Sequence, residues 1–308
     1  MMDETFYHTP VMLGEVLSFL RVTEGGTYFD GTLGGGGHSL AIMKAGGRVI
    51  ATDLDADAIE YAGERFIREG MDGKFTLVRS NFKRFSEVTD ELGIREIDGA
   101  LLDLGVSSRQ FDDGVRGFSY RYDAELDMRM DKRGELTAED IVNDYPAGEL
   151  VKLLYRYGEE NCAKRIVSAI ERERRTHRIK TTGELASLIE RSVPYRKGGH
   201  PAKKTFQALR IEVNGELDGL EKAVDDIVSK LRPGGRICVI TFHSLEDRII
   251  KNELRLLATD CICDRSVPVC VCGHKASVKL FKPVRAGEEE LKANNRSRSA
   301  TLRAAEKL

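Results

Sequence analysis

A short apolar strand that ends in an acid and runs into a glycine-rich turn is the stretch of this sequence best suited to bind a small molecule. Residues 27–38 read Thr-Tyr-Phe-Asp-Gly-Thr-Leu-Gly-Gly-Gly-Gly-His, and a helix-compatible stretch follows. Glycine allows positive φ angles and lets a ligand approach with no Cβ in the way. The first turn of the helix offers unpaired N–H groups. The pattern predicts a strand, a tight turn and a helix around a ligand.

A second acid and the turn itself indicate which ligand. Residues 48–53 read as a buried strand ending at Asp53, where an acid can accept hydrogen bonds from a ribose. No Gly-Lys-Ser/Thr follows the glycines, and their spacing departs from G-x-G-x-x-G, so phosphate-binding loops fit less well. Asp30 would repel a pyrophosphate but suits a cation, such as the sulfonium and amino group of S-adenosylmethionine. An ordinary flexible turn with a surface acid is the alternative.

Two later strand ends extend this predicted site. The apolar run at 97–105 is typical of a strand buried on both faces, and Asp103 lies at its carboxyl end, where open α/β sheets bind ligands. An unpaired carboxylate there is costly unless it is used, so Asp103 is the best catalytic candidate. After the strand at 75–78, Phe82 and its polar neighbours could hold an adenine ring; a core role for Phe82 is nearly as plausible.

Composition limits the class of protein and its partners. At 308 residues, the chain can hold one large or two moderate domains. No apolar run approaches a membrane span and the N-terminus lacks a signal-peptide layout, so we expect a cytoplasmic protein without membrane contact. A formal net charge of −2 gives no global attraction to nucleic acid, so any such binding must come from local basic patches.

Four of the six cysteines cluster as Cys261-x-Cys263 and Cys270-x-Cys272. Disulfides are not expected in a reducing compartment. The two thiol pairs could hold zinc, with His274 as an added or replacement ligand, although zinc-binding pairs usually leave two or more residues between the cysteines. Small buried thiols in a loop are the alternative. We assign no metal from the sequence.

A helical region interrupts the alternating pattern. Residues 112–200 contain no convincing strand and read as helices at 137–144, 147–157, 159–175 and 182–192. The α/β pattern then resumes with a long helix over 202–231, a strand over 236–242, a helix from Ser244 and a final strand over 300–303. We therefore expect a domain of residues 1–111 and 201–308, interrupted by a helical substrate-recognition domain of residues 112–200.

Basic side chains in that region are candidates for RNA contact. The densest run spans 172–180, and a phosphate-binding interpretation assigns contacts to Arg174, Arg175, Arg178 and Lys180. A solvated helix end is the alternative. In the tail, Arg296 and Arg298 could also contact RNA, or could lie in a solvated turn.

The acids, the glycines and a Pro-Gly-Gly turn before strand 236–242 together suggest one fold class. It is an α/β, class I S-adenosylmethionine-dependent methyltransferase fold: Rossmann-like and doubly wound, with an antiparallel terminal strand and an inserted all-α domain. Methyl transfer is an in-line displacement, so the enzyme must hold the nucleophile and the methyl group close and aligned.

Longer motifs resemble one family, the bacterial small-subunit ribosomal RNA cytosine-N4 methyltransferases, which modify a cytidine in the decoding centre. The matching stretches run from end to end: His8-Thr-Pro-Val-Met-Leu, Asp30-Gly-Thr-Leu-Gly-Gly-Gly-Gly-His-Ser, Leu101-Leu-Asp-Leu-Gly-Val-Ser-Ser-Arg-Gln, Arg116-Gly-Phe-Ser, Leu126-Asp-Met-Arg-Met-Asp, His200-Pro-Ala-Lys-Lys-Thr-Phe-Gln-Ala-Leu-Arg-Ile, Phe242-His-Ser-Leu-Glu-Asp-Arg and Arg296-Ser-Arg-Ser. The resemblance implies S-adenosylmethionine contacts at Gly36, Gly37, His38, Asp53, Phe82, Asp103 and Gln110. It also implies 16S rRNA in the small ribosomal subunit as partner. We expect a monomer or a homodimer, between which the sequence does not decide.

Cytosine chemistry suggests the remaining roles. The exocyclic amine is a poor nucleophile, and a carboxylate that accepts an N4–H bond would direct its lone pair toward the methyl group. Asp103 is the first choice; if it binds the amino acid end of the cofactor, Asp127 or Asp131 could serve the base. Phe118, Tyr120 or Tyr122 could stack the unstacked base. A methyltransferase of protein or small molecules, or a non-catalytic ribosome-assembly factor, are the other hypotheses.

Overall fold

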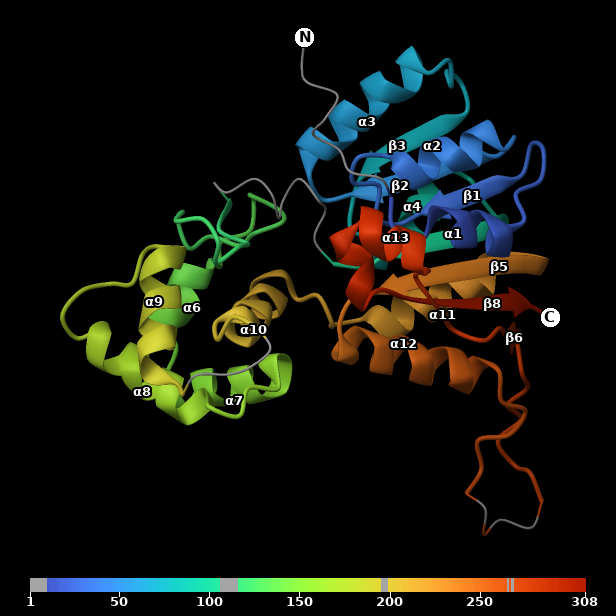
Figure 1. The fold of residues 1–308 in the computed structure, drawn as a ribbon. Coiled ribbons are helices and arrows are strands. Elements are labelled where there is room, and N and C mark those ends of the chain that lie inside the picture. The colour runs from blue at the N-terminus through green and yellow to red at the C-terminus, as the bar shows by residue number, and fades with distance from the viewer. Residues whose placement is uncertain (1–9, 106–115, 195–198, 265, 267–268) are drawn as a thin grey trace. The chain divides into compact units, whose positions relative to one another are not determined.

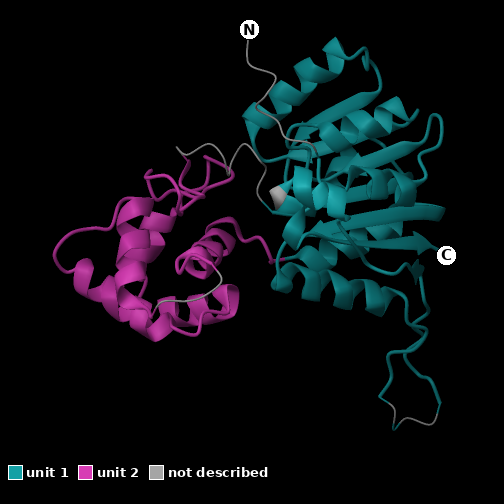
Figure 2. Cartoon of the chain, in the orientation of Figure 1, with its two compact units in different colours: residues 1–105, 219–308 teal, residues 106–218 magenta. Residues whose placement is uncertain are grey.

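The structure is a computed structural model that describes residues 10–105, 116–194, 199–264, 266 and 269–308 (Figure 1). The chain divides into two compact units (Figure 2). The first, here called the sheet unit, comprises residues 1–105 and 219–308, and the second, the helical unit, comprises residues 106–218. Two separate segments of the chain therefore build one unit around an inserted second unit.

The sheet unit is organised around a mostly parallel sheet whose strand order is β3-β2-β1-β4-β5-β8-β6, with β7 also paired to β8. The strands are β1 (Thr27–Asp30), β2 (Arg48–Asp53), β3 (Phe75–Arg79), β4 (Ile97–Asp103), β5 (Leu231–Thr241), β6 (Val278–Leu280), β7 (Val284–Arg285) and β8 (Thr301–Lys307). The first five pair in parallel, whereas β8 runs antiparallel to β5, β6 and β7. This order confirms the predicted doubly wound class with its antiparallel terminal strand.

Helices cover the sheet. In the sheet unit they are α1 (Leu13–Leu20), α2 (Gly37–Lys44), α3 (Ala56–Arg68), η2 (Phe82–Arg84), α4 (Phe85–Glu91), α11 (Leu220–Lys230), α12 (Ser244–Leu257), α13 (Glu288–Ala293) and η4 (Asn295–Ser299). The apolar run of β4 is buried, as are Tyr28 and Phe29 of the neighbouring β1. Phe29 meets Phe85 edge-on at 4.7 Å between ring centroids, which fixes α4 against the sheet. Strands β1 and β4 are therefore held in place by a packed core.

The helical unit contains α6 (Ala138–Asp144), α7 (Ala147–Gly158), α8 (Ala163–Glu173), α9 (Thr182–Ser192) and α10 (Lys203–Asn214). Its local signals are strong, since Thr137 and Thr181 each form a capping box at the start of a helix. Figure 1 shows these helices gathered in the green and yellow part of the chain.

The boundary of the helical unit differs from the expected 112–200, because α10 belongs to this unit. A Cβ on Gly158 of α7 would lie 2.7 Å from the backbone oxygen of Lys204, so α7 and α10 approach at backbone distance. The amide of Gln207 donates to the backbone oxygen of Tyr157 at 3.0 Å. These contacts attach α10 to α7.

The single helix expected over 202–231 is wrong; the chain forms α10 and α11 with a break between them. Gly215 and Gly219 have φ angles of 55° and 72°, which are left-handed values that a helix interior does not allow. Gly215 caps the end of α10 and Gly219 precedes α11. Apolar residues recur at helical spacing across the break and therefore predicted one helix, but the two glycines end α10 and start α11. The break also coincides with the boundary of the two units.

Candidate active site

Three carboxylates lie along one edge of the sheet because of strand register. In β1, Asp30 is paired with Ala51 of β2 on one side and with Leu101 of β4 on the other. Asp53 lies two positions after Ala51 in β2, and Asp103 lies two positions after Leu101 in β4. All three acids therefore stand at the carboxyl ends of adjacent parallel strands. We call Asp30, Asp53 and Asp103 the acid edge. It lies where β1 and β4 meet, which is the point at which the strand order reverses and where such sheets bind ligands.

The glycine-rich turn is tied to the acid edge through backbone groups. The N–H of Gly31 donates to the Leu101 oxygen at 2.9 Å, and the N–H of Leu33 donates to the Thr52 oxygen at 3.0 Å. The N–H of Gly34 donates to Asp53 Oδ2 at 2.8 Å. The turn is therefore bonded to both neighbouring strands, and its shape is fixed before any ligand binds.

Glycine is required at two positions of this turn. A Cβ on Gly31 would lie 2.3 Å from Leu102 Cδ2 and 2.8 Å from Phe82 Cβ. Gly36 has a φ of 73°, and a Cβ there would lie 2.6 Å from the ring of Phe66. Gly36 directly precedes α2, which has no side-chain cap, so the first N–H groups of that helix remain available to a ligand. The backbone is therefore close-packed on one side and open to hydrogen bonding on the other.

Asp30 is the most deeply buried member of the acid edge, with 1% of its surface exposed. Its carboxylate accepts hydrogen bonds from Ser39 Oγ at 2.6 Å and from the Thr32 N–H at 3.1 Å. Burial raises the pKa of Asp30 above its usual range, and the Ser39 bond opposes that rise. Asp30 therefore links the glycine-rich turn to the first turn of α2.

Asp53 and Asp103 are partly accessible and have perturbed proton affinities. Burial raises the pKa of Asp53 to about 6, against the opposing effect of N–H bonds from Asp55 and Gly34. Burial also raises the pKa of Asp103 to about 6, although the nearby His38 and Arg296 lower it. Burial and repulsion from Asp30 both disfavour ionisation of these two carboxyl groups, and a cationic ligand would relieve that electrostatic cost.

Asp103 carries the clearest sign of a missing partner. Its Oδ1 atom is inaccessible to solvent and accepts no hydrogen bond within the described residues. A buried carboxylate oxygen with no donor is costly unless a ligand supplies one. The ammonium and sulfonium groups of S-adenosylmethionine are cations, and the ammonium donates three hydrogen bonds. The acid edge and the open start of α2 therefore fit this cofactor.

His38, Gly37 and Phe82 stand around the same edge. His38 is buried; its Nε2 lies 3.0 Å from the Val11 oxygen, and its Nδ1 lies 3.9 Å from Asp103 Oδ2. Gly37 packs against Pro10, since a Cβ there would lie 2.9 Å from the proline ring. Phe82 is half-buried and begins η2, directly after β3 and the Ser80-Asn81 pair. Gln110 lies outside the described residues.

Asp127 and Asp131 of the helical unit are each held by an arginine. Asp127 accepts bonds from Arg129 Nε at 2.7 Å and Nη2 at 2.9 Å, while Asp131 accepts from Arg133 Nη2 at 2.7 Å. Burial would raise the pKa of Asp127, but the Arg129 bonds outweigh it and the pKa lies below the usual range. The carboxylate of Asp127 is thus a weak base already committed to a guanidinium.

The aromatic candidates differ in availability. Phe118 is buried with 4% exposure, and Arg116 lies over its ring at 5.8 Å. Tyr120 is stacked on His200 at 4.3 Å between centroids and meets Phe206 edge-on at 5.6 Å. Tyr122 is 54% exposed. Of the three, Tyr122 presents the most open ring to a partner.

The basic run over 172–180 separates into two kinds of side chain. Arg174 donates to the backbone oxygens of Val142 and Tyr145 at 3.0 and 2.8 Å, which caps the end of α6. Arg178 binds both oxygens of Asp144 and also contacts Glu139. In the described part of the chain, the exposed side chains of Arg175 and Lys180 have neither hydrogen bond nor ion pair, so only these two of the four candidates keep a free charge.

The tail candidates lie in the sheet unit. Arg296 is the second residue of η4; its N–H donates to Asn294 Oδ1 at 3.2 Å, and its positive charge acts on Asp103. Arg298 is exposed. The tail thus brings one arginine near the acid edge and leaves another at the surface.

Sequence reasoning missed the residues that hold the acid edge in place. Thr32 Oγ1 accepts the Asp103 N–H at 2.6 Å, Ser39 donates to Asp30, and Arg65 Nη1 donates to the Gly35 oxygen at 2.8 Å. Hydroxyls within two residues of the glycines were a usable signal for Thr32 and Ser39. Arg65 sits on α3, 30 residues from Gly35, and nothing local connects it to the turn.

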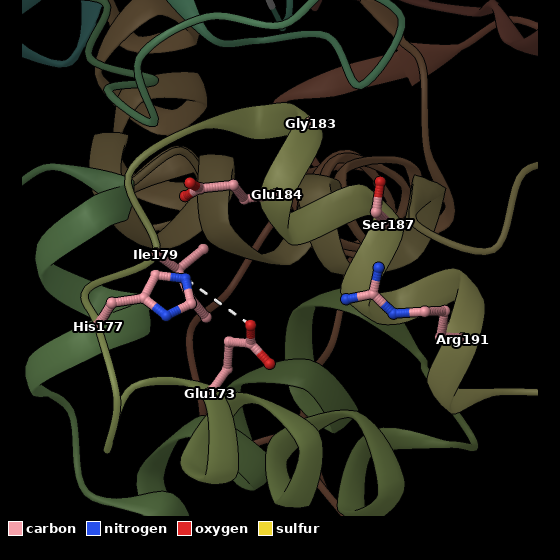
Figure 3. Close-up of a pocket in the computed structure, with 7 residues that line it drawn as sticks. All are labelled: Glu173, His177, Ile179, Gly183, Glu184, Ser187 and Arg191. Carbon is pink, nitrogen blue, oxygen red and sulfur yellow. Dashed lines mark ion pairs between the residues drawn. The ribbon is translucent and has the colours of Figure 1, made fainter.

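A separate hollow of about 300 Å³ lies in the helical unit, lined by Glu173, His177, Ile179, Gly183, Glu184, Ser187 and Arg191 (Figure 3). Figure 3 shows His177 and Glu173 facing one another, with 3.7 Å between His177 Nε2 and Glu173 Oε1. Its charged side chains are substantially exposed, so the hollow lacks the desolvated groups of the acid edge. The acid edge, whose carboxyl groups are desolvated, is therefore the candidate active site.

Comparison with known proteins gives a consistent result along the whole chain. Residues 5–308 match the MraW methylase family. The chain is 50% identical to "Ribosomal RNA small subunit methyltransferase H" of Symbiobacterium thermophilum, over 98% of this chain and 97% of that protein. Identically named proteins of Brevibacillus brevis and Clostridioides difficile are 48% and 49% identical, each over at least 98% of both chains.

Solved structures with similar folds are more distant. An rRNA methylase from Streptococcus thermophilus is 11% identical with a TM-score of 0.42, over 96% of this chain and 95% of that one. A SAM-dependent O-methyltransferase from Thermotoga maritima is 11% identical with a TM-score of 0.43, over 100% of this chain and 68% of that one. The fold class rests on the strand order of the chain itself.

Proposed function

The chain belongs to the MraW methylase family, and on that premise we propose that it methylates the exocyclic N4 amine of one cytidine in the decoding centre of 16S rRNA. The family and the methyl donor, S-adenosylmethionine, are those expected from the sequence. The specific base, its position in the rRNA and the roles of individual side chains are proposed here.

The observation that supports this function best is the unpartnered Asp103 Oδ1 within the acid edge. S-adenosylmethionine supplies an activated methyl group on a sulfonium. Asp103 and the first N–H groups of α2 would bind the charged end of the cofactor, and Asp53 would accept hydrogen bonds from its ribose. Asp30 would act from below through its charge, since its own oxygens are occupied by Ser39 and Thr32.

Asp103 also remains the first choice for the acid that faces the cytosine amine. A carboxylate at this strand end that accepts an N4–H bond would make the nitrogen a better nucleophile. The bonds that Arg129 donates to Asp127 argue against Asp127 as that acid. The same argument applies to Asp131, which Arg133 holds. The two roles of Asp103 are separable by experiment, because one acts on cofactor binding and the other on turnover.

The RNA would be held by charges and rings that the fold leaves available. Arg175 and Lys180 are exposed and lack acidic partners in the described chain, so they are suited to phosphate contacts. Arg298 could add a contact from the sheet unit. Tyr122 is the preferred ring for stacking an unstacked base, with Tyr120 available if it leaves His200. We drop Phe118, Arg174 and Arg178 from this set, since their side chains serve the helical unit.

The proposed partner is the small ribosomal subunit, and the proposed location is the cytoplasm, where that substrate is made. The described helices include none with the length and apolar character needed to span a membrane.

The test uses small subunits from cells that lack this protein. Incubation with the purified protein and labelled S-adenosylmethionine should place one methyl group per subunit, and nucleoside mass spectrometry should identify N4-methylcytidine. Free ribosomal proteins and lipid extract serve as control acceptors. Label on protein or lipid alone would indicate a different methyltransferase. Tight subunit binding without methyl transfer would instead indicate a non-catalytic assembly factor.

A further inference from the structure

The four cysteines of the loop between α12 and β6 converge although they come from two arms of the chain. Cys261 Sγ lies 3.4 Å from Cys270 Sγ and 3.9 Å from Cys272 Sγ, and Cys270 Sγ lies 3.5 Å from Cys272 Sγ. With Cys263, all four sulfur atoms lie within 4.8 Å of one another. Figure 1 shows the loop extending away from the sheet beyond α12. The cluster is thus separate from the acid edge.

These separations are those of a thiolate tetrahedron. With Zn–S bonds of about 2.3 Å, the sulfur atoms of a tetrahedral site stand about 3.8 Å apart. The three separations above, 3.4, 3.5 and 3.9 Å, lie close to that value. All four cysteines are free thiols, and a disulfide would bring its two sulfur atoms to about 2.05 Å. The arrangement places four soft ligands around one centre and does not select two bonded pairs.

Backbone amides support the sulfur atoms. The N–H of Val271 donates to Cys263 Sγ at 3.4 Å, and the N–H groups of Ile262 and His274 are directed at Cys272 Sγ. Such donors stabilise negative charge on sulfur, which a bound metal requires. His274 is used differently, because its Nδ1 lies 2.8 Å from the Thr259 oxygen. The ligand set is therefore four cysteines, with His274 bracing the base of the loop.

Among the described residues of this loop, few contacts hold the part beyond its base. Its base is closed by the N–H of Ser277, which donates to the Leu257 oxygen at 2.7 Å. Beyond the base, the larger apolar side chains face solvent: Ile262 is 52% exposed, Val269 71% and Val271 79%. A loop whose described apolar side chains are exposed needs another source of stability, and a metal ion provides it in small folds.

We propose that Cys261, Cys263, Cys270 and Cys272 bind one Zn²⁺ as a structural site that closes this loop. Each thiol loses its proton as its sulfur binds, and no oxidant or reductant takes part. Four protein ligands complete the tetrahedron, so the ion has no open position for a substrate and serves the fold. The proposal is independent of the methyl-transfer chemistry and of the role of Asp103.

The first measurement is the zinc content of the full-length protein purified without chelators. We expect about one zinc ion per chain, released on thiol modification, and loss of that zinc in the Cys261→Ser and Cys272→Ser double variant. Cys162→Ser is the matched control, since it removes a thiol from the helical unit and should keep the metal. Limited proteolysis should cut the loop of the double variant much faster than that of the control.

A second measurement does not depend on how the variants fold. Cobalt(II) added to metal-free wild-type protein should bind one ion per chain with the absorption bands of a tetrahedral thiolate complex, and zinc should displace it. Absence of those bands under reducing conditions, or zinc content equal in the double variant and wild type, would overturn the proposal. So would peptide mapping that finds two disulfides among the four cysteines in freshly lysed cells.

Discussion

The acid edge of the sheet unit and two acids of the helical unit have opposite electrostatic environments. In the sheet unit, burial raises the pKa values of Asp30, Asp53 and Asp103. In the helical unit, Asp127 and Asp144 are bonded to Arg129 and Arg178, which hold their pKa values below the usual range. The first set waits for a cation from outside, whereas the second is neutralised from within. Buried carboxylates with raised pKa values therefore mark the candidate site, whereas carboxylates bound by arginine stabilise the fold.

The largest effect on methyl transfer is expected for the substitution Asp103→Asn. Methyl transfer should fall by about 100-fold to 1,000-fold, because the variant removes a preorganised charge. The ligand-free variant should nevertheless be more stable than wild type at pH 7.5, by about 1–2 kcal/mol, because it no longer ionises a buried group. Turnover assays and urea unfolding measure the two effects. A variant that is both inactive and destabilised would contradict the idea that Asp103 is strained for function.

The same substitution in the helical unit, Asp127→Asn, should have the opposite effect. It leaves Arg129 without its carboxylate and should destabilise the helical unit by about 2 kcal/mol, with cofactor affinity unchanged. Urea unfolding and calorimetry with S-adenosylmethionine measure the two effects. Asp131→Asn is the control: its partner Arg133 is 61% exposed, so the loss of stability should be small. If Asp127→Asn weakened cofactor binding as strongly as Asp103→Asn, the contrast between the units would be lost.

The pH dependence of cofactor binding follows from the raised pKa values. Asp53 and Asp103 titrate at about 6 in the folded protein, against an ordinary 3.8. Their contribution to stability is therefore complete below about 4 and is lost as pH rises through 6. A cationic ligand needs the charged form, so its affinity should fall about tenfold from pH 7.5 to pH 5. Calorimetry across this range measures it, and Asp103→Asn should show a flatter profile. An affinity that rises toward pH 5 would refute this assignment.

The smallest effect is expected at the surface of the helical unit. Replacing both Arg175 and Lys180 with Glu should weaken rRNA binding several-fold and reduce the salt dependence by about two ions, with cofactor binding unchanged. The control is Lys152→Glu on α7, which also reverses an exposed lysine in this unit. Filter binding over a salt series measures the difference. Equal losses in the double variant and the control would show that the charges act without regard to position.

Some residues of the candidate site could be predicted from the sequence, and others could not. Apolar strands ending at Asp53 and Asp103 were readable because a strand buried on both faces leaves a local apolar run, and its first polar residue marks the edge. The glycine turn was readable because few other residues adopt its backbone. Asp127, Arg174 and Arg178 resembled site residues by type alone. Only their contacts show that they hold the helical unit together.

The sequence alone predicted most of the strands and helices and the chemical types at the sheet edge, because these follow from short-range patterns of polarity and glycine, and its longer motifs indicated the family. The tertiary structure decided which charges remain unpaired. Arg178 meets Asp144 across 34 positions of the chain, and Cys261 meets Cys272 across 11. Such pairings depend on where helices and loops come to rest, and a charge or thiol is available for chemistry only where folding leaves it without a partner.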